Sequence, residues 1–177
     1  MKLVILDRDG TINHDSEDYI KSPAEWTPIP GSLEAIARLH QAHYRVVVAT
    51  NQSGIGRGLF DTQALFAIHD KLQRALGQVG GRIDAFFFCP HAADAGCQCR
   101  KPQPGMLLEA GRRFNVALDE TYMVGDALRD LQAAAAAGAR PVLVLTGKGA
   151  KTSAEGKLPP GTRVFPDLAA FAEHLAP

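Results

Sequence analysis

Cysteine is scarce in this chain of 177 residues, and its three cysteines all fall within residues 89–99. An odd number of cysteines in one short stretch argues against a framework of disulfides. Long apolar runs are also missing, since the first run has only four residues, 3–6, before it meets Asp7. That run is too short for a membrane span or a secretory signal. We therefore expect a cytoplasmic protein that does not enter a membrane.

An excess of charge of one sign is missing as well. The 19 basic and 19 acidic residues give a formal net charge of zero and are dispersed along the chain. This pattern lacks the concentrated basic surface of a nucleic-acid-binding protein. With 46% hydrophobic residues the chain can bury a sizeable core, and we expect a single domain over residues 1–177. The expected partner is a small molecule, and the expected state is a monomer.

Polar side chains follow four short apolar runs, each of which is bounded by residues that favour turns. These are Asp7 and Asp9 after residues 3–6, Thr50 after 45–49, Lys101 beyond 83–88, and Asp126 and Asp130 after 122–124. Because the carboxyl ends of parallel strands face one ligand crevice, these side chains are expected to lie together. Two acids placed there can share a metal ion and a substrate.

Segments with helical periodicity lie between the apolar runs. They cover residues 32–39, 62–77, 106–114 and 131–137, and further strands at 141–145 and 164–165 precede a last helix at 168–175. This alternation predicts an α/β protein with a central parallel sheet between two layers of helices. Ser32 is expected to cap the first helix. The polar stretch at 147–161, rich in Lys, Gly and Pro, is expected to be a mobile surface loop.

The motifs resemble those of the haloacid dehalogenase (HAD) superfamily of phosphotransferases. The match comprises Asp-x-Asp-Gly-Thr at residues 7–11, Thr50, Lys101 and Gly-Asp-x-x-x-Asp at residues 125–130. Four dispersed matches in the family's order are more specific than any one of them. The resemblance covers nearly the whole chain and implies a three-layer, Rossmann-like HAD core. The gaps from Thr11 to Thr50 and from Thr50 to Lys101 leave no room for the cap domain that many members carry.

This resemblance also implies a Mg²⁺-dependent phosphatase that works through an aspartyl phosphate. Asp7 would attack phosphorus, and Mg²⁺ would be held by the Asp7 carboxylate, the Asp9 backbone carbonyl and Asp126, which are the hard oxygen ligands it prefers. Asp9 would protonate the departing oxygen, so it has to begin protonated while Asp7 stays ionised. Thr50 would donate a hydrogen bond to the phosphoryl group, and Lys101 would contribute a positive charge.

Each of these residues also has a purely structural interpretation. Thr50 is consistent with a turn at the end of a strand, Lys101 with a surface cation, and Asp126 with a helix N-cap. Asp130 either orients Lys101 or the waters of the metal, or is an ordinary acid in the first turn of a helix.

The cysteine cluster predicts a second metal site. Cys89, His91, Cys97 and Cys99 supply three thiolates and one imidazole, the closed four-ligand set that is typical of structural zinc. Free thiols are the alternative. Because Arg100 and Lys101 follow directly, a zinc ion here would order the loop that carries them toward the phosphate.

Residues 51–58 and 100–108 look like the heptose bisphosphate phosphatases of the superfamily, which act before heptose activation for lipopolysaccharide. The resemblance implies a sugar bisphosphate substrate, with candidate contacts at Asp15, Asp18, Asn51, Gln52, Ser53, Arg57 and Arg100. Whether Arg57 or Arg100 meets the second phosphate stays open. The loop between His91 and Cys97 has five residues, a length similar to that in histidinol phosphatases and short for some heptose enzymes. Histidinol phosphate is therefore an alternative substrate. A zinc-stabilised binding module without activity is the alternative from another class.

Overall fold

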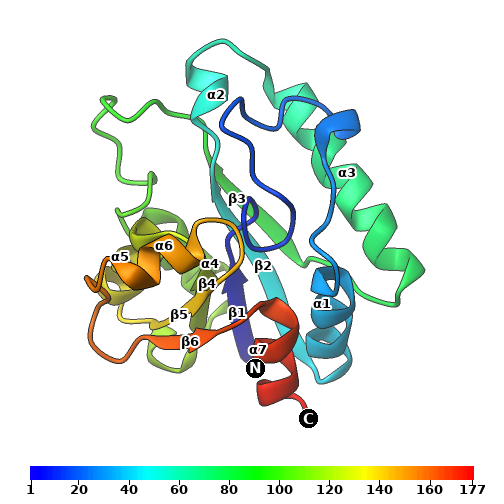
Figure 1. Ribbon diagram of the computed structural model, residues 1–177, viewed down its shortest axis with the longest axis vertical. Helices are drawn as coiled ribbons and strands as arrows, with labels where there is room; N and C mark the ends of the chain where they lie inside the picture. The colour runs from blue at the N-terminus through cyan, green and yellow to red at the C-terminus, as the bar shows by residue number, and fades with distance from the viewer.

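A six-stranded parallel sheet forms the centre of the computed structural model, which describes residues 1–177 (Figure 1). Its strands are β1 (Lys2–Leu6), β2 (Tyr44–Asn51), β3 (Ala85–Cys89), β4 (Tyr122–Gly125), β5 (Arg140–Val144) and β6 (Arg163–Phe165). They lie in the order β3-β2-β1-β4-β5-β6. The direction of winding reverses between β1 and β4, where ligands bind at the carboxyl ends of such sheets. The predicted α/β class with a parallel sheet and no cap domain is confirmed.

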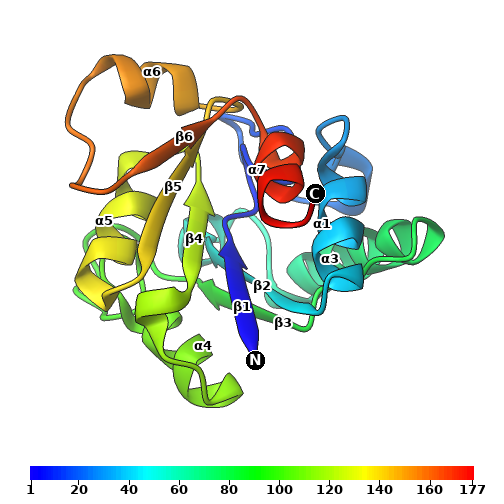
Figure 2. The same ribbon diagram turned by 90° about the horizontal axis from the view of Figure 1, so that it is seen from below.

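Helices cover both faces of this sheet, as Figure 2 shows. One face carries α1 (Ser32–Gln41), α3 (Thr62–Gln78) and α7 (Leu168–Leu175), and the other carries α4 (Gly105–Phe114) and α5 (Leu128–Ala137). Two shorter helices are α2 (Ser53–Gly56) and α6 (Gly149–Ala154), and single 3-10 turns occupy Pro23–Glu25 and Leu118–Glu120. None of the helices combines the length and the apolar content needed to cross a membrane.

The central strand β1 shows why its apolar run is continuous instead of alternating with polar residues. Val4 and Leu6 of β1 pack into the core beneath α1, α3 and α7, whereas Leu3 and Ile5 pack into the core beneath α4 and α5. Successive side chains of a strand point to opposite faces, and both faces here are covered. The polar residues that follow each run therefore mark the place where the strand leaves the core.

Two local expectations from the sequence differ from the structure. Gly31 occupies the N-cap of α1 in place of Ser32, whose hydroxyl donates instead to the Ile12 carbonyl oxygen at 2.6 Å. The stretch 147–161 is not a loop throughout, because it contains α6 and is attached to Asp126 near its start, where Lys148 N donates to Asp126 Oδ2 at 2.8 Å.

Candidate active site

Three buried carboxylates meet at the point where the sheet reverses its winding. Asp7 follows β1 directly, Asp126 follows β4, and Asp130 lies in the first turn of α5. Their carboxylate oxygens lie within 4.8 Å of one another. The expectation that these acids share one edge of the sheet is confirmed by this geometry.

Lys101 reaches into this acid cluster from the loop after β3. Its Nζ lies 2.8 Å from Asp7 Oδ1 and 2.7 Å from Asp130 Oδ1, and it donates to the Ala49 carbonyl oxygen at 2.8 Å. Asn51 fixes the lysine backbone, since its side chain accepts from Lys101 N and donates to Lys101 O, both at 3.0 Å. Burial opposes the charge of Lys101, but Asp130 and Asp7 raise its pKa above the ordinary value. The surface-cation interpretation of Lys101 is wrong.

The cluster carries more negative charge than Lys101 neutralises. Burial and the carboxylate of Asp130 raise the pKa of Asp7 to about 6, despite the opposing effect of Lys101. Burial and the charges of Asp7 and Asp130 raise the pKa of Asp126 to about 8. A hard divalent cation with oxygen ligands fits both the donor set and this excess of negative charge. The three carboxylates are therefore suited to hold Mg²⁺.

Asp126 is held by a cradle of backbone and hydroxyl groups. Its Oδ2 accepts from Lys148 N at 2.8 Å, and its carbonyl oxygen accepts from Thr152 Oγ1 at 2.8 Å. A Cβ added to Gly10 or Gly147 would lie 2.1 or 2.3 Å from Asp126 Oδ2, and both glycines have positive φ angles of 84° and 55°. Only glycine fits at these two positions. Ala127, not Asp126, is the N-cap of α5, so the helix-cap interpretation is wrong.

The surroundings of Asp9 differ from those of the cluster. Its Oδ1 accepts from Arg8 Nε at 2.9 Å and Asn13 Nδ2 at 3.0 Å, while its Oδ2 accepts from Gln52 Nε2 at 3.0 Å. Burial alone would raise the pKa of Asp9, but the Arg8 guanidinium and these hydrogen bonds lower it below the ordinary value. The protein's own groups thus keep Asp9 ionised, contrary to the expectation that it begins protonated. The buried Arg8 is the physical reason.

A polar cavity of about 220 Å³ opens beside these acids. It is lined by Asp7, Asp9, Asp15, Ser16, Glu17, Tyr19, Ile20, Thr50, Asn51, Gln52, Ser53, Arg100, Lys101, Arg129 and Lys148. Five of the seven predicted substrate contacts are in this set. Asp18 and Arg57 are exposed and lie outside it. Thr50 lines the cavity and its Oγ1 accepts from Gln52 Nε2 at 2.9 Å, which leaves the hydroxyl hydrogen free to donate.

Two cations of this cavity, Arg129 and Lys148, were missed by reasoning from the sequence. Lys148 Nζ lies 3.6 Å from Asp15 Oδ2. It stands shortly after β5, so the strand-end argument applied to that strand would have found it. Arg129 lies between the two acids of the Gly-Asp-x-x-x-Asp motif, where the sequence gives no sign of the side chain's direction.

The four predicted zinc ligands converge at the end of β3. Cys89 Sγ lies 3.1 Å from Cys99 Sγ, 3.6 Å from Cys97 Sγ and 3.3 Å from His91 Nδ1, and the four donor atoms lie within 4.8 Å of one another. Partial burial acts to raise the pKa of Cys97, but the Arg100 backbone N–H and the neighbouring thiols lower it to about 6. Three sulfurs and one imidazole nitrogen at these distances fit a closed structural zinc site.

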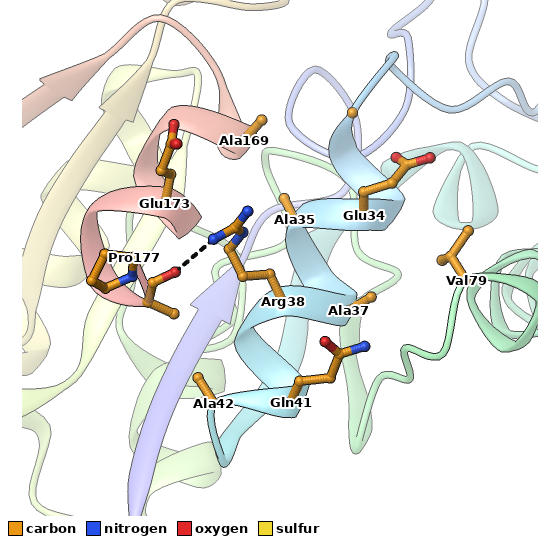
Figure 3. Close-up of a pocket in the computed structure, with 12 residues that line it drawn as sticks. Glu34, Ala35, Ala37, Arg38, Gln41, Ala42, Val79, Ala169, Glu173 and Pro177 are labelled. Atoms are coloured by element: carbon orange, nitrogen blue, oxygen red, sulfur yellow. Dashed lines mark hydrogen bonds between the residues drawn. The ribbon is translucent and has the colours of Figure 1, made fainter.

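A larger cavity of about 700 Å³ lies away from these residues, between α1 and α7 (Figure 3). Small alanine side chains form much of its wall, and Arg38 Nη1 crosses it to donate to the Ala176 carbonyl oxygen at 2.9 Å. It contains no cluster of metal-ligating or nucleophilic groups. Size alone therefore does not identify the site of chemistry.

Comparison with known proteins agrees with this site. Residues 98–171 match the HAD-hydrolase-like family model. The chain is 63% identical to the D-glycero-beta-D-manno-heptose-1,7-bisphosphate 7-phosphatase of Bordetella bronchiseptica, over 99% of this chain and 98% of the relative. The Pseudomonas aeruginosa enzyme of the same name is 53% identical, over 98% and 97% of the two chains.

A solved structure gives the same result. The D,D-heptose 1,7-bisphosphate phosphatase of Bordetella bronchiseptica, crystallised with magnesium and phosphate, superposes with a TM-score of 0.97 at 63% identity and covers 99% of this chain and 98% of its own. The protein described here therefore belongs to the D-glycero-beta-D-manno-heptose-1,7-bisphosphate 7-phosphatase family of HAD-like hydrolases.

Proposed function

We propose that this protein removes the 7-phosphate of D-glycero-beta-D-manno-heptose 1,7-bisphosphate, a step in making the heptose of lipopolysaccharide. The observation that carries the proposal is the buried cluster of Asp7, Asp126 and Asp130 around Lys101, beside a polar cavity. Phosphoryl transfer depends mostly on positioning and on neutralising charge, and this cluster supplies both. The choice of substrate is supported by the names of two relatives that are 63% and 53% identical to this chain.

Asp7 is the proposed nucleophile. It lines the cavity, and its Oδ1 accepts a hydrogen bond from Lys101 Nζ. Mg²⁺ bound by the carboxylates of Asp7 and Asp126 and by the Asp9 carbonyl would neutralise the phosphate and lower its repulsion of the nucleophile. Asp7 would then form a bond to phosphorus as the bond to the sugar oxygen breaks, which gives an aspartyl phosphate for water to hydrolyse. Thr50 and Lys101 would donate to the phosphoryl oxygens.

Asp9 is the proposed acid and base. Its Oδ1 already has several donors, so Oδ2, with Gln52 as its single partner, is the oxygen free to carry a proton. The protein alone lowers the pKa of Asp9. A phosphate dianion placed beside it acts in the opposite direction, because a nearby like charge favours the protonated carboxyl. Proton uptake by Asp9 is therefore coupled to substrate binding.

The second phosphate of the substrate is proposed to meet Arg100 and Arg129. Both line the cavity, and Arg100 Nη1 and Arg129 Nε are buried without a hydrogen-bond partner. Buried guanidinium nitrogens without partners are costly unless an anion completes them. Arg57, by contrast, is exposed and outside the cavity.

A comparison of substrates tests the proposal. Heptose 1,7-bisphosphate, fructose 1,6-bisphosphate and histidinol phosphate are supplied at equal concentrations with Mg²⁺, and specificity is scored as ratios of kcat/KM. We expect the heptose bisphosphate to have the highest value, and Asp7→Asn serves as the inactive control. A preference for histidinol phosphate would replace the proposed substrate. Absence of phosphate release from all three would favour the binding module without activity.

The monomer is the proposed working unit. A reducing compartment such as the cytoplasm is proposed for it, since thiols that hold zinc must stay reduced. Sedimentation velocity at micromolar concentration tests the first point, and a fluorescent fusion in intact cells tests the second.

A further inference from the structure

Arg8 stands between the two acids of the Asp-x-Asp motif, yet its side chain is fully buried. Its Nε donates to Asp9 Oδ1 at 2.9 Å, and its Nη2 lies 2.8 Å from the same oxygen. Arg8 does not line the cavity, and neither does His69, its other side-chain partner. The guanidinium therefore acts on the site only through the Asp9 carboxylate.

The remaining arm of the guanidinium contacts a histidine on another element. Arg8 Nη1 lies 3.2 Å from Nε2 of His69, which belongs to α3 and is 5% exposed. Arginine has donors only, so His69 Nε2 has to be the acceptor, and the ring is neutral with its hydrogen on Nδ1. Burial and the charge of Arg8 lower the pKa of His69 to about 3, which agrees with this assignment.

The ring of His69 is itself fixed by stacking on Phe86 of β3. The two ring centroids are 4.1 Å apart, and the planes differ by 12°. Phe86 thus sets the plane of the imidazole, and the imidazole sets the direction of one arm of Arg8. A chain of contacts runs from β3 and α3 to the carboxylate that follows β1.

The consequence lies in the two oxygens of Asp9. Arg8 and Asn13 supply the donors to Oδ1, while Oδ2 accepts from Gln52, which lines the cavity as Asp9 does. Arg8 Nη2 is already buried without a hydrogen-bond partner, and without His69 Nη1 would lose its acceptor as well. Two unsatisfied buried nitrogens on one guanidinium favour a new position of the side chain. A shifted guanidinium no longer dictates which Asp9 oxygen is free.

We propose that His69 is a positioning residue for phosphate ester hydrolysis, acting through Arg8 to fix the oxygen of Asp9 that exchanges the proton with the leaving group. The proposal rests on the proposed role of Asp9. Because the base step is shared by all esters, the proposal predicts a larger effect on esters whose leaving oxygen must be protonated than on esters whose leaving group departs as a stable anion.

The test compares His69→Leu with His69→Gln, which keeps a side-chain acceptor. Both are assayed with p-nitrophenyl phosphate and with the sugar phosphate that has the highest kcat/KM. Because displacements of about 1 Å can cost on the order of 100-fold in rate, we expect His69→Leu to lose roughly 10- to 100-fold in kcat on the sugar phosphate. KM should change by less than about 3-fold, the loss on p-nitrophenyl phosphate should be clearly smaller than the loss on the sugar phosphate, and His69→Gln should recover most of both losses.

Leu72→Ala is the matched control, because Leu72 is also buried on α3 but has no side-chain group that could accept a hydrogen bond from Arg8. It should lower the melting temperature without changing the ratio of the two rates. Arg8→Lys, which cannot span Asp9 and His69 together, should reproduce the selective loss if His69→Leu does not fold.

Several outcomes would overturn the proposal. Equal losses of His69→Leu on both substrates, a ratio change in Leu72→Ala of the same size, or no loss on the sugar phosphate would each do so. Asp9→Asn separates this from the proposed mechanism: if the activity of that variant also falls equally on both esters, the proposed acid role of Asp9 fails. A wild-type protein inactive on heptose bisphosphate but active on another sugar phosphate would refute only the substrate.

Discussion

The single lysine of the acid cluster binds two carboxylates and one backbone carbonyl at once. Lys101 Nζ donates to Asp7 Oδ1 and to the Ala49 carbonyl oxygen, both at 2.8 Å, and forms an ion pair with Asp130 Oδ1 at 2.7 Å. Three groups from separate segments hold the ammonium, which restricts its rotation. Asp130 thereby acts as the group that orients the lysine, which is one of the two interpretations that its place in the sequence allowed.

Asp7→Asn tests the nucleophile. We expect turnover to fall by on the order of 10⁴-fold or more, because an amide cannot replace the attacking carboxylate. The fold should persist, since burial and Asp130 already raise the pKa of Asp7 and its charge is unfavourable in the metal-free protein. Phosphate release and the melting temperature in Mg²⁺-free buffer are the two measurements. An active Asp7→Asn protein would place the nucleophile elsewhere.

Arg129→Gln tests the contact with the second phosphate. Hydrogen bonds to charged groups contribute about 1.5 to 3 kcal/mol, so kcat/KM for a bisphosphate should fall roughly 10- to 100-fold. The value for p-nitrophenyl phosphate, which has no second phosphate, should stay within about 3-fold of wild type. Arg57→Gln is the control at an exposed arginine outside the cavity and should leave both substrates unchanged. A larger effect from Arg57 than from Arg129 would reverse the assignment.

At the scale of elements, the loop after β3 combines a metal site with a catalytic group. The three thiols and His91 lie at its start, and Lys101 follows Cys99 by two residues. Such a loop has little apolar core of its own, and a structural zinc can supply roughly 10 to 16 kcal/mol of apparent binding free energy to order it. The position of Lys101 is therefore tied to the zinc ligands along the chain.

Cys97→Ser tests this coupling. We expect a lower zinc content than the one equivalent of the wild type, together with a fall in both kcat/KM and melting temperature, because a loosened loop misplaces the ammonium group. Metal analysis of reduced protein, calorimetry and phosphate release measure the three quantities. Asp94→Asn, an exposed change in the same loop, should alter none of them. A stable Cys97→Ser protein that keeps its zinc yet fails to turn over would give the zinc a chemical role.

The sequence predicted those elements whose signals are local. The apolar runs of β1 and β2 and the start of α3 after Asp61, whose carboxylate accepts from Ala64 N at 2.9 Å, depend on neighbours in the chain. The prediction of a loop over 147–161 was wrong because a polar composition indicates exposure but excludes neither the short helix α6 nor the hydrogen bond from Lys148 N to Asp126.

The site shows the same division. The side chains that the structure brings together in the acid cluster and in the Cys/His cluster could be predicted because they stand at strand ends or in a short segment. Arg8 was missed because the pattern of apolar residues along a strand does not reveal that a charged side chain is buried against a histidine of a distant helix, here His69 of α3. Asp15 and Asp18 look alike in sequence, and only the path of their loop places the first in the cavity and the second outside.

At the scale of the molecule, the metal-free protein is expected to become less stable as pH rises. Asp7 and Asp126 have pKa values of about 6 and about 8, raised from 3.8, so the folded state binds protons more tightly than the unfolded state in between. Stability is then greatest below the unfolded value and falls as pH rises through the folded values. Mg²⁺ should reverse this trend, because it binds the ionised carboxylates.

Melting temperatures between pH 5 and pH 8.5, with and without Mg²⁺, measure the effect after desalting has removed the weakly held ion. The gain from Mg²⁺ should grow with pH. Asp126→Asn removes the carboxyl group with the higher of the two raised pKa values. It should therefore flatten the metal-free curve of melting temperature against pH at its upper end. A gain from Mg²⁺ that is largest at pH 5 would contradict the charge imbalance in the cluster.

The cradle around Asp126 also fixes when the enzyme can begin to work during its own synthesis. Asp7 is among the first of the site residues to leave the ribosome, whereas Lys148 and Thr152, which hold Asp126, follow about 140 residues later. Domains fold as units as the chain emerges. A nascent chain that already displays the proposed nucleophile therefore lacks the framework for the proposed metal ligand, and phosphate esters meet a competent site only once synthesis has passed residue 152.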